Sequence, residues 1–362
     1  MRVLYDPQTF MRQRAGGISR LFTDLIVEFD RDLALGVEPE VPFTWTPNTH
    51  ASQALDYRGI RATPDWLPRG ATYAPWWIRG RTRASGLDLV HHTYYSERFL
   101  GSPRGAKQVV TVVDMIPELL ASSNFYTGSH LQKRRYVETC DLIICISEST
   151  RQDMLEHFGT VGGEVRVVPL AVQPGFGPEH EPLVGLPLEY LLYVGARAGY
   201  KDFALLPQAL QVLGSSGIDI PLLVVGKPFT AAETVTLKEH GVIDRVIQRR
   251  LSDGDLKRAY ANSSLVVQTS RYEGFGLTPL EGMASGVPVV VANASSMPEV
   301  GGDVAQYFTA GDAEDLARVI QRVLTDSALR RGLALSGPVR AREFSTALMA
   351  KRTAEAYREA QE

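Results

Sequence analysis

Short runs of apolar, mostly β-branched residues recur along the chain and alternate with longer stretches of helical periodicity. Several runs are apolar at consecutive positions, which is typical of strands that are covered on both faces. Alternation of such strands with helices predicts parallel sheets built from strand–helix–strand units. The predicted strands are 2–6, 88–92, 108–114, 141–147, 165–170, 190–195, 221–226, 245–250, 264–269 and 288–293.

One helix is strongly specified by its pattern. Apolar residues recur every three or four positions after residue 17, which makes a single apolar stripe on a helix. The loop before this stripe contains Gly16 and Gly17, so a glycine pair leads from the first strand into a helix N-terminus. The stripe consists of Ile18, Leu21, Phe22, Leu25, Ile26 and Phe29.

The length of 362 residues exceeds one typical core, so two domains are expected. A stretch rich in proline and glycine near the middle reads as a linker. Two doubly wound α/β domains joined there would face each other across a cleft, with ligands gathered outside the carboxyl ends of the strands. The predicted parts are an N-terminal domain, 1–172, a linker, 173–189, a C-terminal domain, 190–340, and a last helix, 341–362, that could pack back on the first domain.

Composition narrows the class of protein. The 38 basic and 41 acidic residues leave a formal charge of −3, which gives no footprint for nucleic acid. No apolar run approaches the roughly 20 residues that span a bilayer, and the first residues lack the long apolar region of a signal peptide and are expected to form a strand. Cys140 and Cys145 lie in the strand-like segment "CDLIICIS", where a spacing of five puts them on opposite faces, and they are expected to be reduced, which favours the cytoplasm.

One segment could contact a membrane. Residues 73–83, "YAPWWIRGRTR", combine tryptophan and arginine, a composition compatible with peripheral contact with the anionic inner face of a membrane. A loop packed on its own domain is the favoured interpretation, because apolar side chains are more often part of a core.

The segment "EGFGLTPLEG" raises the question of a binding site. Thr278, Pro279 and Glu281 fit a capping box, in which Glu281 does no more than close a helix start. A ligand role is the alternative, since Gly274 and Gly276 let backbone approach a ligand closely. A helix N-terminus at the carboxyl end of a strand binds anions, and a nearby carboxylate can hold sugar hydroxyls.

Positive charge for such an anion is available in the loop after strand 190–195. Arg197 and Lys201 lie in "YVGARAGYKD". Taken alone they read as solvated loop cations. At the carboxyl end of a strand in the same domain as the helix start, they favour a diphosphate ligand.

The same segments carry a family resemblance. "EGFGLTPLEG" and the residues after it closely resemble the donor-site signature of glycosyltransferase family four, retaining enzymes of the GT-B fold: Glu273, seven residues, Glu281, then "SGVPV" and "PE". "GARAGYK", "RAGGISR" and "ISEST" match further segments of that family. The match runs from residue 1 to about residue 345.

The resemblance implies roles for single residues. Arg197 and Lys201 would bind the diphosphate of a nucleotide sugar, Glu281 the ribose hydroxyls and Glu273 the transferred sugar. Gly17 would let its loop close over the diphosphate, and Arg249 and Leu251 would meet the base. The implied donor-binding set is Gly16, Gly17, Arg197, Lys201, Arg249, Leu251, Glu273, Gly274, Phe275, Gly276, Leu277, Thr278 and Glu281.

One departure from the family concerns the catalytic residues. Many relatives carry His-Asp after the strand equivalent to 108–114, whereas this chain has Val113 and Asp114. In those relatives the histidine reaches the donor sugar near the reacting carbon. A valine side chain cannot form a hydrogen bond, so this role is vacant or passes to Asp114. Asp114 and Glu273 form the predicted catalytic set. The alternative for Asp114 is a cap of the next turn.

A second motif suggests an acceptor site. "HHTYY" resembles a motif of relatives that build bacterial surface polysaccharides, and it implies that His91, Tyr94 and Tyr95 line the acceptor site. Packing at a domain surface is the alternative for these rings.

The activity that the resemblance implies is retaining transfer of a hexose to a saccharide or lipid-linked saccharide acceptor, without a cofactor or metal ion. A GDP-mannose-type donor is favoured, with UDP- and dTDP-sugars as alternatives. Two other interpretations stay open. One is an epimerase or phosphorylase of the same fold, and the other is a non-catalytic module that binds nucleotide sugar or glycan.

Overall fold

The computed structural model describes residues 1–64, 86–101, 105–120, 132–197 and 199–362. The predicted membrane-contact segment 73–83 lies outside these ranges. Within them, no helix has the length and apolar character needed to cross a bilayer.

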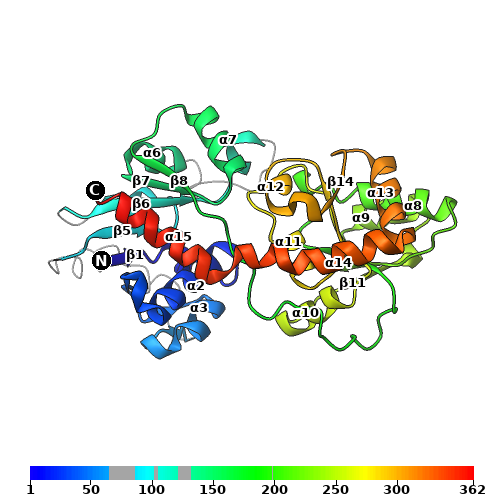
Figure 1. The fold of residues 1–362 in the computed structure, drawn as a ribbon, viewed down its shortest axis with the longest axis horizontal. Coiled ribbons are helices and arrows are strands. Elements are labelled where there is room, and N and C mark those ends of the chain that lie inside the picture. Colours follow the sequence, from blue (N-terminus) through cyan, green and yellow to red (C-terminus); the bar gives the residue numbers. More distant parts are fainter. Residues whose placement is uncertain (65–85, 102–104, 121–131, 198) are drawn as a thin grey trace. The chain divides into compact units, whose positions relative to one another are not determined.

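The chain divides into two compact units (Figure 1). The first comprises Met1–Ala171 and Thr346–Glu362, and the second comprises Val172–Ser345. The segment 173–189, expected to be a linker, groups with the second unit, and the last helix groups with the first.

The first unit is built on a parallel sheet in the order β2-β1-β5-β6-β7-β8. The order reverses between β1 and β5, where Tyr5 lies beside His91. Strands β5 and β7 are buried at every position, which explains why their sequences lack alternation. The strands are β1 (Arg2–Tyr5), β2 (Glu38–Glu40), β5 (Leu89–His92), β6 (Lys107–Val112), β7 (Leu142–Cys145) and β8 (Glu164–Val167), with a separate pair, β3 (Trp45–Thr46) and β4 (Arg61–Ala62).

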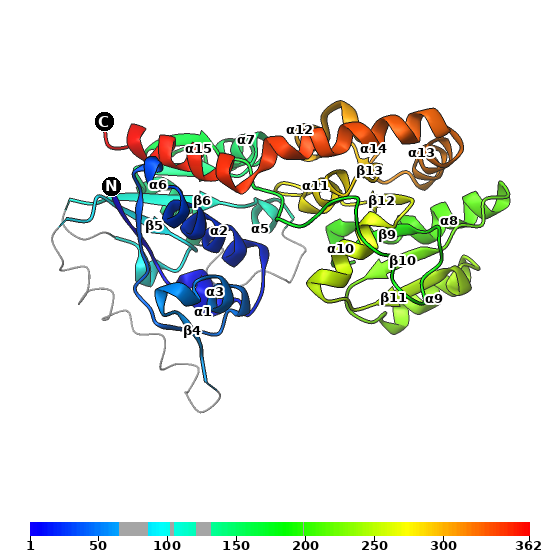
Figure 2. The same ribbon diagram turned by 60° about the horizontal axis from the view of Figure 1, so that its bottom comes forward.

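The predicted amphipathic helix is confirmed as α2, whose apolar stripe faces the core, with Phe22, Ile26 and Phe29 buried. Helix α15 packs on α2 (Figures 1 and 2). The hydroxyl of Tyr357 on α15 lies 2.9 Å from that of Tyr5, so the last helix is part of this core. The helices are α1 (Gln8–Arg12), α2 (Gly17–Arg31), α3 (Thr49–Ala54), α5 (Ile116–Leu119), α6 (Lys133–Thr139), α7 (Glu148–Phe158) and α15 (Thr346–Glu359).

The second unit contains a parallel sheet in the order β11-β10-β9-β12-β13-β14, which is the order of doubly wound dinucleotide-binding domains. The order reverses between β9 and β12. All residues of β10, β12 and β13 are buried. The strands are β9 (Leu191–Val194), β10 (Leu222–Val225), β11 (Val246–Arg249), β12 (Leu265–Gln268), β13 (Val289–Ala292) and β14 (Gln306–Phe308).

Helices of the second unit cover this sheet. Helix α8 packs on α13, and α11 packs on β12, β13 and α14 (Figure 2). This packing fixes the start of α11 at the carboxyl edge of β12. The helices are α8 (Leu205–Ser215), α9 (Ala231–Glu239), α10 (Asp253–Ala261), α11 (Leu277–Ala284), α12 (Met297–Gly301), α13 (Ala313–Thr325) and α14 (Ser327–Ala341).

Candidate functional site

Two loops at the carboxyl edge of the second unit's sheet carry most of the predicted donor site. Their strands, β9 and β12, are hydrogen-bonded neighbours, with Leu191 beside Leu265. The strand order reverses here, which is where doubly wound sheets bind ligands. The hydroxyl of Thr269, just after β12, donates to the carbonyl oxygen of Lys201 (2.8 Å), so the two loops are joined.

Lys201 and Glu273, one from each loop, form an ion pair. The Lys201 Nζ lies 2.6 Å from Oε1 and 2.8 Å from Oε2 of Glu273, and the side chains are only 18% and 13% exposed. Partial burial lowers the local dielectric and strengthens the pair. A cation and a carboxylate in direct contact suit a ligand whose phosphate adjoins sugar hydroxyls.

Glu273 is oriented from several sides. Gln268 Nε2 lies 2.5 Å from its Oε1, the Glu273 N–H donates to Ser295 Oγ (2.9 Å), and the Ser296 hydroxyl donates to the Glu273 carbonyl oxygen (2.9 Å). The side-chain oxygen of Gln268 is buried and has no hydrogen-bond partner among the described residues. Backbone and carboxylate are therefore fixed before any ligand arrives.

Backbone strain is concentrated at this pair. In the described part of the chain, the non-glycine residues with positive φ are Asp202 (+49°) and Ser295 (+47°). Asp202 follows Lys201, and Ser295 accepts the hydrogen bond from Glu273. Such conformations cost about 1–3 kcal/mol each and cluster at functional sites. The strain supports a functional interpretation of the pair.

Arg197, the other predicted cation, is held by Glu233 of α9. Its Nε lies 2.7 Å from Oε1 of Glu233, and its Nη2 lies 3.2 Å from Oε2. Nη2 also donates to the Pro228 carbonyl oxygen (2.9 Å). The guanidinium lies 4.8 Å from the centre of the Phe229 ring. Burial alone would raise the pKa of Glu233, but hydrogen bonds from Arg197 and Thr230 outweigh it and lower that pKa. Nη1 has no hydrogen-bond partner within the described ranges, and a contact of Arg197 with a diphosphate stays a prediction.

Helix α11 begins differently from the prediction. Gly276 precedes its first residue, Leu277, and no side chain caps it. The predicted capping box is wrong, because Thr278 and Glu281 both lie inside the helix. Gly276 has a φ of +117°, and a Cβ there would lie 2.5 Å from Met297 Cε. A glycine packed against a methionine, rather than a polar cap, therefore sets the entry into the helix.

The start of α11 leaves backbone donors open. The N–H groups of Phe275, Gly276, Leu277 and Thr278 have no hydrogen-bond partner among the residues that the structure describes. Open N–H groups at a helix N-terminus carry partial positive charge and bind anions. They lie at the carboxyl end of β12, as do Gly274 and Glu273.

Glu281 is held one turn into α11. Its Oε2 accepts a hydrogen bond from the Tyr260 hydroxyl (2.7 Å). Burial of Tyr260 on α10 raises its pKa well above the ordinary value, and the negative charge of Glu281 raises it further. The Tyr260 hydroxyl therefore stays protonated and fixes the carboxylate.

The predicted base-contact residues lie at the same edge, farther along the sheet. Arg249 ends β11, which is separated from β9 by β10, and its exposed side chain donates to the Gln248 carbonyl oxygen (3.0 Å). Leu251 follows and is half-buried. Their contact with a base stays a prediction.

Gly16 and Gly17 are in the first unit, at the start of α2. Gly16 precedes the helix and Gly17 is its first residue; both are exposed. Gln13 caps this end, because its Oε1 accepts from the Ser19 N–H (3.1 Å). A Cβ at residue 17 would meet nothing within 4 Å, whereas a Cβ at residue 16 would lie 2.6 Å from Gln13 Oε1, so the space is open at Gly17 but not at Gly16.

Asp114 follows β6 in the first unit. Its Oδ1 accepts a hydrogen bond from the Ile116 N–H (3.1 Å), and its carbonyl oxygen accepts one from Lys133 Nζ (2.7 Å). Lys133 is fully buried and also pairs with Glu118 (2.8 Å). The hydrogen bond from the Ile116 N–H supports the turn-capping interpretation of Asp114, and a catalytic role stays a prediction.

Two of the three predicted acceptor residues are interior. His91 is fully buried, with Nδ1 facing the Tyr357 hydroxyl (2.5 Å) and Nε2 facing the Thr111 hydroxyl (2.8 Å). Tyr95 is 1% exposed and donates to the Thr111 carbonyl oxygen (3.0 Å). Both side chains have their polar atoms engaged in the core, so the expectation that they contact an acceptor is wrong. Tyr94 is 9% exposed and stays a candidate.

The buried His91 gives a prediction for stability. Burial lowers its pKa to about 3, so the folded protein keeps this ring neutral where the unfolded chain binds a proton. The free energy of unfolding is therefore expected to fall by about 2 kcal/mol from pH 7 to pH 5 through this residue, because the unfolded state binds more protons below about pH 6.5. Urea unfolding of the wild type and of His91→Gln at both pH values measures the difference. An unchanged pH dependence in the variant would contradict the prediction.

Comparison with known proteins adds to this geometry. The family model "Glycosyltransferase Family 4" matches residues 15–176, and "Glycosyl transferases group 1" matches residues 184–337. Together they cover most of both units. The chain belongs to glycosyltransferase family four.

Relatives of this family-four chain include mannosyltransferases. It is 29% identical to O-antigen chain mannosyltransferase B of Escherichia coli over 61% of each chain. It is 28% identical to serotype-specific mannosyltransferase WbdA of Escherichia coli over 67% of this chain and 32% of that protein. The alignments thus span less than two thirds of these relatives.

The fold is shared with solved glycosyltransferase structures. Anabaena HepE in complex with UDP and glucose superposes with a TM-score of 0.70 at 17% identity, over 99% of this chain and 100% of that chain. Together with the two parallel sheets, this confirms the predicted GT-B fold of two doubly wound domains.

The family-four site also contains residues that sequence reasoning missed. They are the groups that hold the predicted ones: Gln268 and Ser295 for Glu273, Glu233 for Arg197, and Tyr260 for Glu281. Ser295 lies within the segment that carries the resemblance. No motif marks Glu233 or Tyr260, because each is brought to its partner only by the packing of a separate helix.

Proposed function

We propose that this protein is a retaining hexosyltransferase that takes a sugar from a nucleotide diphosphate sugar. The observation that carries the proposal is the convergence of Arg197, Lys201 and the open N–H groups of 275–278 at the point where the strand order reverses. These are the donors that a diphosphate requires. Their position at a topological switch point is where such a ligand is expected.

The proposed chemistry places these donors against the leaving group. As the bond from the sugar carbon to the phosphate oxygen breaks, negative charge develops on the diphosphate, and Lys201, Arg197 and the α11 amides stabilise it. The acceptor oxygen bonds to the same face of that carbon, and its proton passes to the departing phosphate. Since the chain supplies this positive charge itself, we propose that no metal ion is required.

The carboxylates would bind hydroxyl groups of the donor. Glu273 touches Lys201, so it lies where the sugar joins the phosphate, and we assign it to the transferred sugar. Glu281 would bind the ribose. Arg249 and Leu251 would meet the base, and Gly16 and Gly17 would admit the diphosphate beside α2.

The mannosyltransferase relatives favour a GDP-mannose donor and a saccharide or lipid-linked saccharide acceptor in polysaccharide synthesis. We propose that Tyr94 belongs to the acceptor side, with Asp114 as the nearby candidate for proton transfer. We propose that the protein acts in the cytoplasm, at the inner face of the membrane. This location fits the proposed substrates and the two buried, free cysteines.

A thermal-shift panel tests the donor site. GDP, UDP and dTDP are compared with their monophosphates, each at the same concentration. The preferred diphosphate is expected to add about 2.7 kcal/mol at 100 times its Kd, and the monophosphate much less because Lys201 and Arg197 lose a phosphate partner. We expect GDP to give the largest shift. Absence of any shift from all three diphosphates would contradict the proposal.

Product analysis separates the alternatives. A transferase forms a glycoside only when acceptor is present. An epimerase of the same fold would release free sugar and nucleotide without acceptor, and a phosphorylase would require inorganic phosphate. Donor binding without any turnover would support a non-catalytic module.

A further inference from the structure

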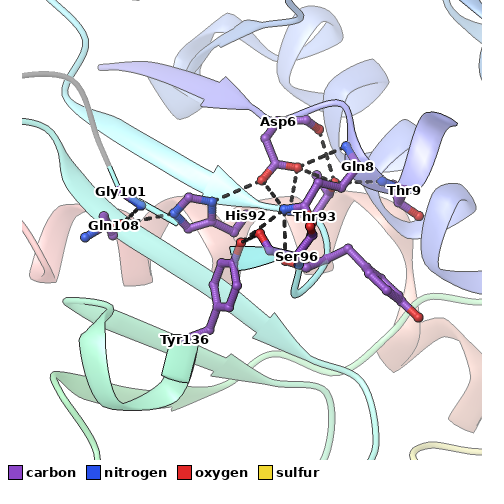
Figure 3. Close-up of polar contacts among 10 residues, drawn as sticks. Asp6, Gln8, Thr9, His92, Thr93, Ser96, Gly101, Gln108 and Tyr136 are labelled. Atoms are coloured by element: carbon purple, nitrogen blue, oxygen red, sulfur yellow. Dashed lines mark hydrogen bonds and ion pairs between the residues drawn. The ribbon is translucent and has the colours of Figure 1, made fainter. Parts of the chain in front are cut away.

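A cluster of buried polar side chains lies at the carboxyl edge of the first unit's sheet, where β1 and β5 are neighbours (Figure 3). Asp6 follows β1, and His92 ends β5. Asp6, Gln8, His92 and Thr93 are each at most 2% exposed. None of them belongs to the donor site of the second unit.

The Asp6 carboxylate is surrounded by donors. Its Oδ1 accepts from the Gln8 N–H (3.2 Å), the Thr93 N–H (3.2 Å) and the Thr93 hydroxyl (2.7 Å), and its Oδ2 accepts from Gln8 Nε2 (2.7 Å). These hydrogen bonds favour the ionised form of Asp6 over a protonated carboxyl, whose hydrogen, among the groups named here, could go to the Thr93 hydroxyl or to His92 Nδ1. A buried carboxylate needs a counter-charge.

His92 faces an acceptor at each ring nitrogen. Nδ1 lies 3.0 Å from Asp6 Oδ2, and Nε2 lies 3.2 Å from Gln108 Oε1 (Figure 3). The Gly101 N–H donates to the same Gln108 oxygen (2.8 Å), which fixes the orientation of that amide. Exchanging its oxygen and nitrogen would set an NH₂ group against the Gly101 N–H.

A neutral imidazole has one N–H and one lone pair, so beside an ionised Asp6 one of the two contacts would oppose two lone pairs. With Asp6 ionised, a ring with a proton on each nitrogen satisfies both contacts. We infer that His92 is a buried imidazolium that pairs with Asp6, and that this pair positions the two loops at the carboxyl edge of the first unit.

The preceding residue shows the contrast. Both partners of His91 are hydroxyl groups, which donate or accept as needed, so a neutral ring fits there. Burial lowers the pKa of His91 to about 3. Other titratable side chains lie close by. The Tyr136 hydroxyl donates to the Ser96 carbonyl oxygen (2.6 Å), Asp141 accepts from the Gln108 N–H (2.7 Å), and burial, followed by the charges of Asp141 and Asp6, raises the pKa of the Cys140 thiol.

The pair holds two segments together through Gln8. The Gln8 N–H bonds to Asp6, its Nε2 also donates to the Tyr94 carbonyl oxygen (3.1 Å), and its Oε1 accepts from the Ser96 N–H (2.8 Å). Gln8 begins α1, which leads to Gly16 and Gly17. The Asp6–His92 pair therefore fixes both the glycine loop and Tyr94. Its relevance to catalysis rests on the proposed function.

Nitrogen NMR tests the protonation state. The full chain is labelled with ¹⁵N-histidine and measured at about pH 7.5, where an unperturbed imidazole is mostly neutral. Correlation of the ring C–H protons with both ring nitrogens reports which nitrogen carries a proton. His92 is expected to show two protonated nitrogens and His91 one. Gln108→Glu keeps an acceptor before Nε2 and assigns the His92 signals. One unprotonated nitrogen on His92 would overturn the inference, whether or not the protein transfers sugar.

Kinetics tests the positioning role. Asp6→Asn keeps the size of the side chain but removes its charge, and we expect kcat/KM for the acceptor to fall about 10- to 100-fold. Tyr357→Phe is the matched control, because it removes a buried hydroxyl bonded to Tyr5 and His91 elsewhere in the same core. Both variants are measured well below their unfolding midpoints. If kcat/KM for the acceptor falls equally in both, the Asp6–His92 pair has only a structural role.

Should Asp6→Asn not fold, Gln108→Leu takes its place, because it removes only the acceptor at His92 Nε2. Loss of the Nε2 proton together with a lower kcat/KM then supports the inference. Retention of wild-type kinetics after that proton is lost would contradict it. Absence of transfer by the wild-type protein would instead contradict the proposed function and leave the NMR result standing.

Discussion

Lys201→Ala is expected to lower the rate of sugar transfer by about 10²- to 10³-fold while the protein stays folded. The ammonium is one of the preorganised charges proposed to meet the departing diphosphate, and removal of one such group typically costs this much. The loss should fall mainly on kcat, because the charge that Lys201 stabilises grows as the bond breaks. Initial rates at saturating donor measure it.

Stability limits how far this variant can be interpreted. Loss of the ammonium leaves Glu273 with the Gln268 amide, which still lies 2.5 Å from its Oε1. We expect a cost of about 1–3 kcal/mol, the range for a partly buried charged group that loses one partner. Urea unfolding of the variant measures this cost separately from activity.

Arg271→Ala provides the matched control for Lys201→Ala. Arg271 pairs with Asp202 (2.6 Å) in the same two loops, but its side chain is 61% exposed. Exposed pairs contribute at most about 1 kcal/mol. If Arg271→Ala lowers the rate as much as Lys201→Ala, the effect belongs to loop structure and not to charge at the diphosphate.

The strands were predictable because burial on both faces leaves a direct trace in sequence. Predicted strand 264–269 is Leu265–Gln268, and predicted strand 288–293 is Val289–Ala292. Their order in the sheet could not be derived from pattern alone, because crossover connections decide which strands become neighbours. The position of the site at the carboxyl ends followed from the fold class.

The errors have a common cause. Thr278 fits a capping box by spacing, but contact of Gly276 with Met297, twenty-one residues later, decides where α11 begins. His91 lies in a motif that suggests an acceptor site, but a strand covered on both faces buries it together with its neighbour His92. Each outcome depends on side chains from distant elements, which local pattern does not contain.

Substitution of Glu281 is the second prediction with a large expected effect. In the proposed site its carboxylate binds ribose hydroxyls, and hydrogen bonds to a charged group contribute about 1.5–3 kcal/mol. Glu281→Ala is therefore expected to raise the KM for the donor roughly 10- to 100-fold. Glu281→Gln keeps an acceptor for Tyr260 but loses the charge, and it should retain stability while binding donor less well.

The structure shows why the alanine variant needs a control for stability. Tyr260 is fully buried and donates to Glu281 (2.7 Å), so Glu281→Ala also takes away that acceptor, at a cost of about 1–3 kcal/mol. Tyr190→Phe makes a comparable loss without touching the site, since the buried Tyr190 hydroxyl donates to the Ala259 carbonyl oxygen (2.8 Å).

Donor KM and urea unfolding are measured for Glu281→Ala, Glu281→Gln and Tyr190→Phe. A ligand role requires that KM rise in both Glu281 variants and stay near the wild-type value in Tyr190→Phe. If Glu281→Gln binds donor as tightly as the wild type, while Glu281→Ala and Tyr190→Phe weaken binding in proportion to their loss of stability, Glu281 serves only to satisfy Tyr260. The charge of the side chain, separated from its structural hydrogen bond, thus decides between the two roles that its position in α11 allows.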